Sequence, residues 1–238
     1  MNLKKHIPNL ITLLNLLSGC IALVFAGEAN FEMAFFFVCL GIFFDFFDGF
    51  FARLFNVSSP LGLQLDSLAD MVTSGVVPGY VMFKMLSNSV NSNPSLMYLP
   101  YLGFVITLGS CYRLANFNID TRQTDSFIGL PTPANAIFIL SLPLILKNSD
   151  SLLVLEMLTN YWILLMVSII SAFILNAEIP LFALKIKKFN LKENALQLFF
   201  LLISILLLVL FQFSGVALVI IFYVSLSVIM NLITVKKA

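Results

Sequence analysis

Charged residues are scarce in this 238-residue chain. Asp, Glu, Lys and Arg make up 11% of it, whereas hydrophobic residues make up 60% and phenylalanine occurs 25 times. An average soluble protein has about 25% charged and about 45–50% apolar residues. The composition therefore excludes an ordinary soluble domain and predicts an integral membrane protein. A nucleic-acid-binding role has no support, because no soluble basic domain is present to carry a binding surface.

Histidine and cysteine are also rare. The single histidine, His6, precedes the first apolar run, where we expect an interfacial position rather than a metal ligand. Cys20, Cys39 and Cys111 have no C-x-x-C spacing and fall in or beside apolar runs, where packing is the expected role. The sequence therefore favours neither a zinc site nor a nucleophile of the Ser–His or Cys–His type.

Long apolar runs, by contrast, fill most of the chain. They are about 15 to 25 residues long and are separated by short polar joints, and about 20 apolar residues cross a hydrocarbon core as a helix. We predict an all-α polytopic membrane protein with about eight transmembrane helices in a single membrane domain, residues 1–238. The expected spans are Leu10–Ala26, Phe31–Leu54, Leu61–Leu86, Leu96–Phe117, Pro133–Leu146, Leu152–Leu175, Ala195–Phe211 and Val216–Thr234.

The basic residues predict the orientation of these spans, because Lys and Arg are retained on the cytoplasmic side of short loops. If both termini lie inside, eleven of the 13 basic residues fall on the cytoplasmic side and only Lys84 and Lys147 fall outside. We therefore expect both termini in the cytoplasm.

Four aspartates interrupt the apolar pattern in the stretch FFDFFDGFFARLFNVSSPLGLQLDSLADMV, residues 43–72. Small and acidic residues at helical spacing share one face of the second expected span: Asp45, Asp48, Gly49 and Ala52. A second set shares one face of the third span: Gly62, Asp66 and Asp70. Only the joint FNVSSP separates the two spans, so they must form an antiparallel hairpin whose acidic faces can meet. The small residues would leave room for a bulky polar ligand beside the carboxylates.

Four carboxylates in such a place repel one another, and each ionised side chain costs at least roughly 2.5–3.5 kcal/mol at the centre of a membrane helix. One or two divalent cations would neutralise the cluster. Oxygen ligands without Cys or His favour a hard ion, Mg²⁺ or Mn²⁺. Structural ion pairs and a proton relay in a transporter are the alternatives. A single nearby arginine cannot balance four aspartates, and a transporter would spread its acidic residues over several helices.

The same residues form a pattern, D-x-x-D-G-x-x-A-R-x8-G-x3-D-x3-D, that begins at Asp45 and ends at Asp70. This pattern resembles the signature of the CDP-alcohol phosphatidyltransferase family at every defined position. The resemblance implies an enzyme that binds a pair of divalent metal ions and the pyrophosphate of a CDP-activated lipid. In such an enzyme, an alcohol displaces CMP.

Two further segments resemble the serine-using bacterial and archaeal members of that family. The first, IPNLITLLN, carries Asn9 and Thr12, which would line the nucleotide site. The second, RLANFNIDTRQTDSFIGLPTPANA, resembles R-L-A-R-F-N followed by F-x-G-L-P-T-P-A, with Asn116 in place of the second arginine. The expected reaction is transfer of the phosphatidyl group of CDP-diacylglycerol to the hydroxyl of L-serine. Glycerol 3-phosphate or inositol phosphate remains an alternative acceptor.

The resemblance also assigns roles to individual residues. Asp45, Asp48 and Asp66 would be mainly metal ligands, whereas Asp70 would be the general base and would also touch a metal. Expected contacts with the CDP-lipid come from Asn9, Thr12, Gly49, Ala52, Arg53 and Gly62. Expected contacts with the serine carboxylate or a phosphate come from Arg113 and Arg122, for which a purely topological role is the alternative.

The resemblance further implies a homodimer in a prokaryotic inner membrane, with the active site on the cytoplasmic side. Residues 1–176 would form a six-helix catalytic core around the metal motif at residues 45–70. Residues 177–238 would add two C-terminal transmembrane helices.

Overall fold

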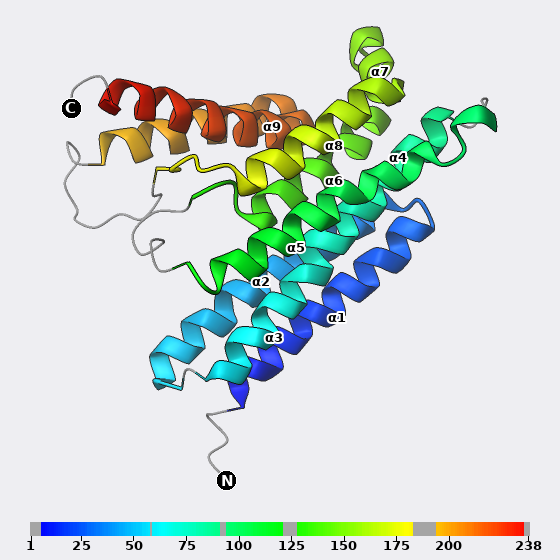
Figure 1. The fold of residues 1–238 in the computed structure, drawn as a ribbon. Helices are drawn as coiled ribbons and strands as arrows, with labels where there is room; N and C mark the ends of the chain where they lie inside the picture. The colour runs from blue at the N-terminus through cyan, green and yellow to red at the C-terminus, as the bar shows by residue number, and fades with distance from the viewer. Residues whose placement is uncertain (1–5, 58, 91–93, 121–127, 183–193, 236–238) are drawn as a thin grey trace.

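The computed structural model describes residues 6–57, 59–90, 94–120, 128–182 and 194–235. Within these ranges the regular structure is helical, apart from one isolated antiparallel bridge between Ile128 and Pro180. The all-α prediction is therefore confirmed for the described residues. In chain order the elements are α1 (Ile7–Gly27), α2 (Phe31–Phe55), α3 (Pro60–Asp70), η2 (Met71–Val76), α4 (Val77–Val90), η3 (Pro94–Leu96), η4 (Leu99–Phe104), α5 (Val105–Phe117), α6 (Thr132–Asn148), α7 (Leu152–Thr159), α8 (Tyr161–Asn176) and α9 (Ala195–Val235) (Figure 1).

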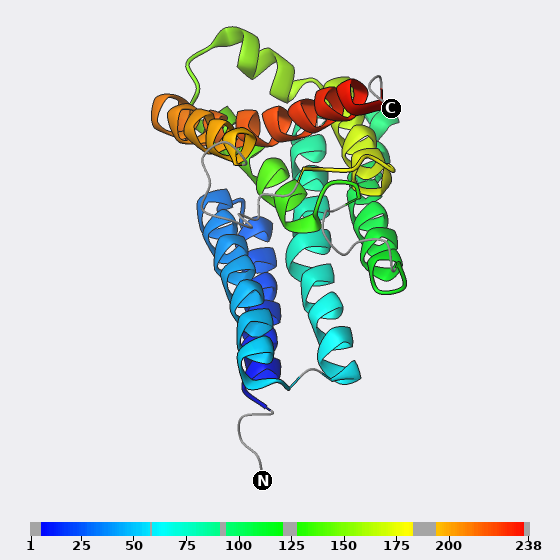
Figure 2. The ribbon, with the colours of Figure 1, turned by 90° about the vertical axis from the view of Figure 1, so that its left-hand side faces the viewer.

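Helices α1 and α2 form an antiparallel hairpin and run side by side along the molecule (Figure 1, Figure 2). The side chain of Asn30 caps the start of α2 by accepting a hydrogen bond from the Met33 N–H at 3.3 Å. Helix α2 ends where Asn56 adopts a left-handed conformation with φ of 53°. Asp45 and Asp48 precede this end of α2, and the short joint to α3 follows it.

The third expected span is one continuous helical path, from Pro60 to Val90, made of α3, η2 and α4. Ser59 caps its start by accepting from the Gly62 N–H at 3.0 Å, and Pro60 occupies the first turn, where its missing N–H costs nothing. The middle segment, η2, is a π-helix directly after Asp70. A π-turn inserts an extra residue and so changes which side chains face the neighbouring helices.

Fewer described helices than the expected eight are long and apolar enough to cross a membrane. Among the described residues, three helices are long and apolar enough to cross a membrane: α1, α2 and α9. Helices α7 and α8 would make a fourth if they act as one span, but they meet at a 71° bend. The expected spans Leu61–Leu86 and Leu96–Phe117 contain helix, but π or 3₁₀ turns divide them into shorter segments, such as η4 and α5. The expected span Pro133–Leu146 lies in α6, which is undivided but has only 17 residues. A uniform hydrophobic run does not reveal such divisions.

Helix α9 corresponds to the last two expected spans. Its helical geometry breaks at Gln212, which has φ of 47°, and its two arms then lie side by side across one end of the other helices (Figure 1, Figure 2). Gly215 allows this close return, because a Cβ there would collide with the backbone of Leu207 and Leu208. A small apolar cluster that includes Phe200 and Tyr223 packs α9 against the rest of the chain.

The main core lies among α1, α2, α4, η4, α5, α6 and α8. Its largest fully buried side chains include Met82, Leu86, Ile106, Ile139 and Leu164. Many large apolar side chains on the outer surface are exposed, as a protein surrounded by lipid requires. The polar residues described below are therefore the exception in an apolar bundle.

Candidate active site

Three carboxylates meet between α2 and α3. Asp45 and Asp48 come from α2 and Asp66 comes from α3, and each offers an oxygen atom within 4.8 Å of the others. Asp48 is buried, with 6% of its surface exposed, and the other two are partly buried. These oxygens fit a divalent cation of the hard type, because carboxylates are its preferred protein ligands. The acidic faces of the two helices therefore meet as the residue spacing predicted.

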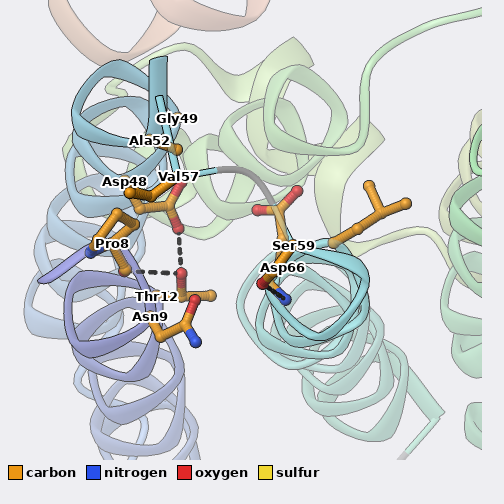
Figure 3. A pocket seen from close by; sticks show the side chains of 11 residues that line it. Pro8, Asn9, Thr12, Asp48, Gly49, Ala52, Val57, Ser59 and Asp66 are labelled. Atoms are coloured by element: carbon orange, nitrogen blue, oxygen red, sulfur yellow. Dashed lines mark hydrogen bonds between the residues drawn. The ribbon is translucent and has the colours of Figure 1, made fainter. Parts of the chain in front are cut away.

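Helix α1 supplies a hydrogen bond to this cluster. The hydroxyl of Thr12 lies 2.5 Å from Asp48 Oδ2 and 3.0 Å from the Pro8 carbonyl oxygen. A hydroxyl has one proton to donate, and the short distance favours the carboxylate as its acceptor. Figure 3 shows Thr12 and Asp48 facing each other across the α1–α2 contact. The bond holds one oxygen of Asp48 and leaves the other for a ligand.

Asp70 is held from α1 as well, by a residue that the sequence reasoning did not select. Asn15 Nδ2 donates to Asp70 Oδ1 at 3.0 Å. The Asn15 side-chain oxygen accepts from Thr73 Oγ1 at 2.8 Å. Asn15 and Thr73 are both fully buried. A signal was available in the sequence, since Asn15 is an amide inside an apolar run on the same helix as Thr12.

A cavity of about 180 Å³ lies beside the carboxylates at the α1 side. Its lining includes all but one of the residues expected to contact the CDP-lipid, together with two of the carboxylates: Asn9, Thr12, Asp48, Gly49, Ala52, Gly62 and Asp66 (Figure 3). A larger residue at Gly62 would be crowded, because a Cβ there would lie 3.2 Å from the side-chain oxygens of Asn9 and Ser59. We call this space the first cavity.

A second cavity, of about 210 Å³, lies on the other side of the carboxylates. Its polar lining comes from α2, α3, α5 and the start of α6: Asp45, Asp66, Ser67, Asp70, Arg113 and Thr132. Ser67 also accepts a hydrogen bond from Asn118 Nδ2 at 2.9 Å, which ties the end of α5 to α3. Asp66 lines both cavities, so one carboxylate of the cluster borders each of them.

The three arginines selected from the sequence have different positions. Arg113 is 7% exposed, and its Nη1 donates to the carbonyl oxygens of Ile128 at 3.0 Å and Leu175 at 3.4 Å. It lines the second cavity, as Asp70 does, and its bonds to two carbonyl oxygens give it a structural role. Arg53 is exposed and is not among the residues that line the first cavity. Its guanidinium lies against Gly49, which does line it. Arg122 lies outside the described residues.

A family model, CDP-alcohol phosphatidyltransferase, matches residues 5–173. The chain belongs to the CDP-alcohol phosphatidyltransferase family. The matched region contains both cavities and all four aspartates. Membership of this family favours the enzyme over the transporter that the acidic residues alone left open. It also agrees with a carboxylate cluster that could hold a metal ion.

Several curated members of the CDP-alcohol phosphatidyltransferase family are similar to the chain. A CDP-diacylglycerol–serine O-phosphatidyltransferase of Bacillus subtilis is 39% identical over 133 residues, which cover 54% of this chain and 70% of that protein. The Helicobacter pylori (strain 26695) protein of the same name is 33% identical over 199 residues, covering 82% and 79%. An archaetidylserine synthase of Methanothermobacter thermautotrophicus is 30% identical over 149 residues, covering 59% and 61%.

Proposed function

We propose that the chain transfers the phosphatidyl group of CDP-diacylglycerol to the hydroxyl of L-serine, which gives phosphatidylserine and CMP. The observation that carries the proposal is a carboxylate cluster with one cavity on each side and Asp66 shared between them. This arrangement suits a direct displacement, because the acceptor hydroxyl must attack the phosphorus of the donor on the side opposite the departing CMP. The names of the similar proteins support serine as the acceptor.

The donor would occupy the first cavity. Asn9 and Thr12 would face the nucleotide, and the small side chains of Gly49, Ala52 and Gly62 would leave room for the pyrophosphate. Arg53, whose guanidinium lies over Gly49, is placed to pair with a phosphate at the rim. This assignment keeps all six residues expected to contact the CDP-lipid on one side of the carboxylates.

A divalent metal, Mg²⁺ or Mn²⁺, would be held by Asp45, Asp48 and Asp66. We propose two ions, with Asp70 as an additional ligand of one of them. When bound, the metal would neutralise charge on the phosphates and favour the departure of CMP. The carboxylates would orient the donor, because they would fix the position of the metal that neutralises its phosphates.

The acceptor would occupy the second cavity. Arg113 would pair with the serine carboxylate, and Asp70 would take the proton from the serine hydroxyl. We propose a similar role in binding serine or phosphate for Arg122. The serine oxygen then attacks phosphorus directly, the new P–O bond forms, and the bond to the CMP oxygen breaks.

A CMP-release assay tests the proposal. Purified protein in detergent micelles would receive CDP-diacylglycerol and Mn²⁺, with serine, glycerol 3-phosphate or inositol phosphate in separate reactions. We expect CMP release with serine, none without an acceptor, and loss of activity when EDTA removes the metal. Release with glycerol 3-phosphate but not serine would overturn the acceptor assignment, and no release with any acceptor would overturn the phosphatidyl-transfer proposal.

We further propose an inner-membrane location with eight spans, both termini in the cytoplasm and the active site on that side. Single cysteines replacing the exposed residues Asn116 and Ser151, in a background without the native cysteines, would report the two faces. A membrane-impermeant thiol reagent should label the cysteine at 151 from outside and the cysteine at 116 only after permeabilisation. Labelling of both positions from one side would contradict this topology.

The proposed division of labour places catalysis in residues 1–176 and leaves two added transmembrane helices in residues 177–238. In support, the family match ends at residue 173, and the described residues of both cavities lie between Pro8 and Pro133. We also propose a homodimer, which light scattering of the purified protein would test by its mass in detergent. A monomer mass under conditions where CMP release is full would contradict it.

A further inference from the structure

Asn15 makes a directional contact with Asp70. Its Nδ2 is a donor and faces Asp70 Oδ1 at 3.0 Å, whereas its Oδ1 is an acceptor and faces Thr73 Oγ1 at 2.8 Å. The carboxylate of Asp70 can only accept when it is ionised, so it selects the amide orientation in which the N–H₂ group points at it. The Thr73 hydroxyl fits this orientation, because it can donate to the amide oxygen, and it also lies 3.2 Å from the Asn15 backbone oxygen. The opposite orientation would bring an amide oxygen against a carboxylate oxygen. The three side chains therefore form a chain of two hydrogen bonds, from Thr73 through Asn15 to Asp70.

The surrounding backbone is shaped to hold Thr73 in this place. Thr73 lies in the π-helix η2 and is fully buried between α1 and α2. A Cβ at Gly19 would collide with Thr73 Oγ1, and a Cβ at Gly41 would lie 2.7 Å from Thr73 Cγ2 and 2.8 Å from Asn15 Oδ1. Both helices therefore carry glycine where this threonine packs. Gly19 leaves room for the Thr73 hydroxyl, and Gly41 leaves room for its methyl group and for the amide oxygen of Asn15.

We propose that Asn15 is a positioning residue for proton transfer, and that Thr73 fixes Asn15 in the orientation that this role needs. The proposal rests on the phosphatidyl-transfer function proposed above. Asn15 occupies Oδ1 of Asp70 and leaves Oδ2 as the oxygen that receives the proton of the acceptor hydroxyl. The proton moves to Asp70 as the acceptor oxygen bonds to phosphorus and the bond to CMP breaks, so Asn15 and Thr73 change no bonds themselves.

The experiment compares Thr73→Val with Thr73→Ser in the full-length protein. Valine keeps the shape of threonine and removes the hydroxyl, whereas serine keeps the hydroxyl. We expect Thr73→Val to lower kcat about 10- to 100-fold, because a misplaced catalytic group costs up to about 100-fold in rate. The KM for CDP-diacylglycerol should stay within about 2-fold, and Thr73→Ser should restore kcat to within about 3-fold of the wild type. Asn15→Leu, which removes both amide groups, should lower kcat at least as much as Thr73→Val.

Mn²⁺ affinity, measured by titration in the absence of substrates, separates this role from a structural one. Thr73→Val should bind the Mn²⁺ ion held by Asp45, Asp48 and Asp66 as tightly as the wild type, because the substitution does not touch these three carboxylates. A wild-type kcat in Thr73→Val, or a loss of Mn²⁺ binding parallel to the loss of kcat, would overturn the proposal. If the wild-type protein released no CMP in the assay above, the phosphatidyl-transfer function itself would fail. If only the proposal for Asn15 and Thr73 were wrong, the wild-type protein would still release CMP with serine.

Discussion

Replacement of Arg113 tests the assignment of the second cavity to the acceptor. The guanidinium is almost completely buried, and one of its nitrogens, Nη1, already donates to the carbonyl oxygens of Ile128 and Leu175. These bonds join the segment before α6 to the end of α8. The same side chain lines the cavity that contains Asp70. Arg113 therefore has a structural role and, if serine binds there, a second role toward the serine carboxylate.

The two roles have different energetic signatures. Loss of a charge-assisted hydrogen bond to serine costs about 1.5–3 kcal/mol, which is about 10- to 150-fold in apparent affinity. The bonds to Ile128 and Leu175 have a charged donor, and the loss of each costs about 1.5–3 kcal/mol. The first cost falls on serine alone. The second cost destabilises the protein and should affect the binding of both substrates alike.

Steady-state kinetics of Arg113→Ala and Arg113→Lys, with thermal unfolding in detergent, would measure both costs. We expect Arg113→Ala to raise the KM for serine about 10- to 150-fold and to change that for CDP-diacylglycerol little. Arg113→Lys, which keeps the charge but not the planar fork, should fall between the alanine variant and the wild type.

Arg53→Ala is the matched control, since Arg53 lies beside the first cavity and its loss should raise the KM for CDP-diacylglycerol instead. An Arg113→Ala variant that loses CDP-diacylglycerol affinity and keeps its serine dependence would refute the assignment. Arg113 would then belong to the phosphate site.

Three other predictions concern the metal cluster, the packing around it and the reaction course. Asp66→Asn should lose both Mn²⁺ binding and turnover. Asp70→Asn should lose turnover with a much smaller change in CDP-diacylglycerol binding. Near wild-type turnover of Asp70→Asn at saturating serine would exclude Asp70 as the general base. Gly41→Ala should destabilise the protein by about 1–3 kcal/mol and lower kcat, because the new methyl group would enter the space of Thr73. Gly27→Ala is the control and should do neither, because its Cβ would lie 3.6 Å from the Tyr80 hydroxyl. Direct attack by serine predicts inversion at phosphorus with a chiral thiophosphate substrate, and retention would instead indicate a phosphatidyl-enzyme intermediate.

The carboxylate cluster could be predicted from the sequence because its information is local. Spacings of three and four residues place side chains on one face of a helix. A six-residue joint leaves two successive helices little choice but to lie antiparallel. Asp45, Asp48 and Asp66 therefore had to meet once both segments were helical, and they do.

The spans and the last helices were harder to predict, because hydropathy carries no information on backbone geometry. A run of apolar residues reads the same whether it is a straight helix, a helix divided by a π-turn at Met71–Val76, or a helix broken at Gln212. The bend between α7 and α8 falls at Asn160, whose side chain accepts from the Trp162 N–H at 2.9 Å and so starts a new helix inside an expected span.

The contact of Asn15 with Asp70 lies beyond local reasoning for a different reason. Asn15 and Asp70 are 55 positions apart, and Thr73, which donates to Asn15, lies in a π-turn that the sequence does not reveal. Spacing within α1 predicts that Thr12 and Asn15 lie one turn apart, but not which aspartate each will meet. In the structure Thr12 binds Asp48 and Asn15 binds Asp70, so one helix contacts a carboxylate of each of the other two. A shift of α1 would change both contacts, and a larger residue at Gly19 would force such a shift, because a Cβ there would collide with Thr73 of η2.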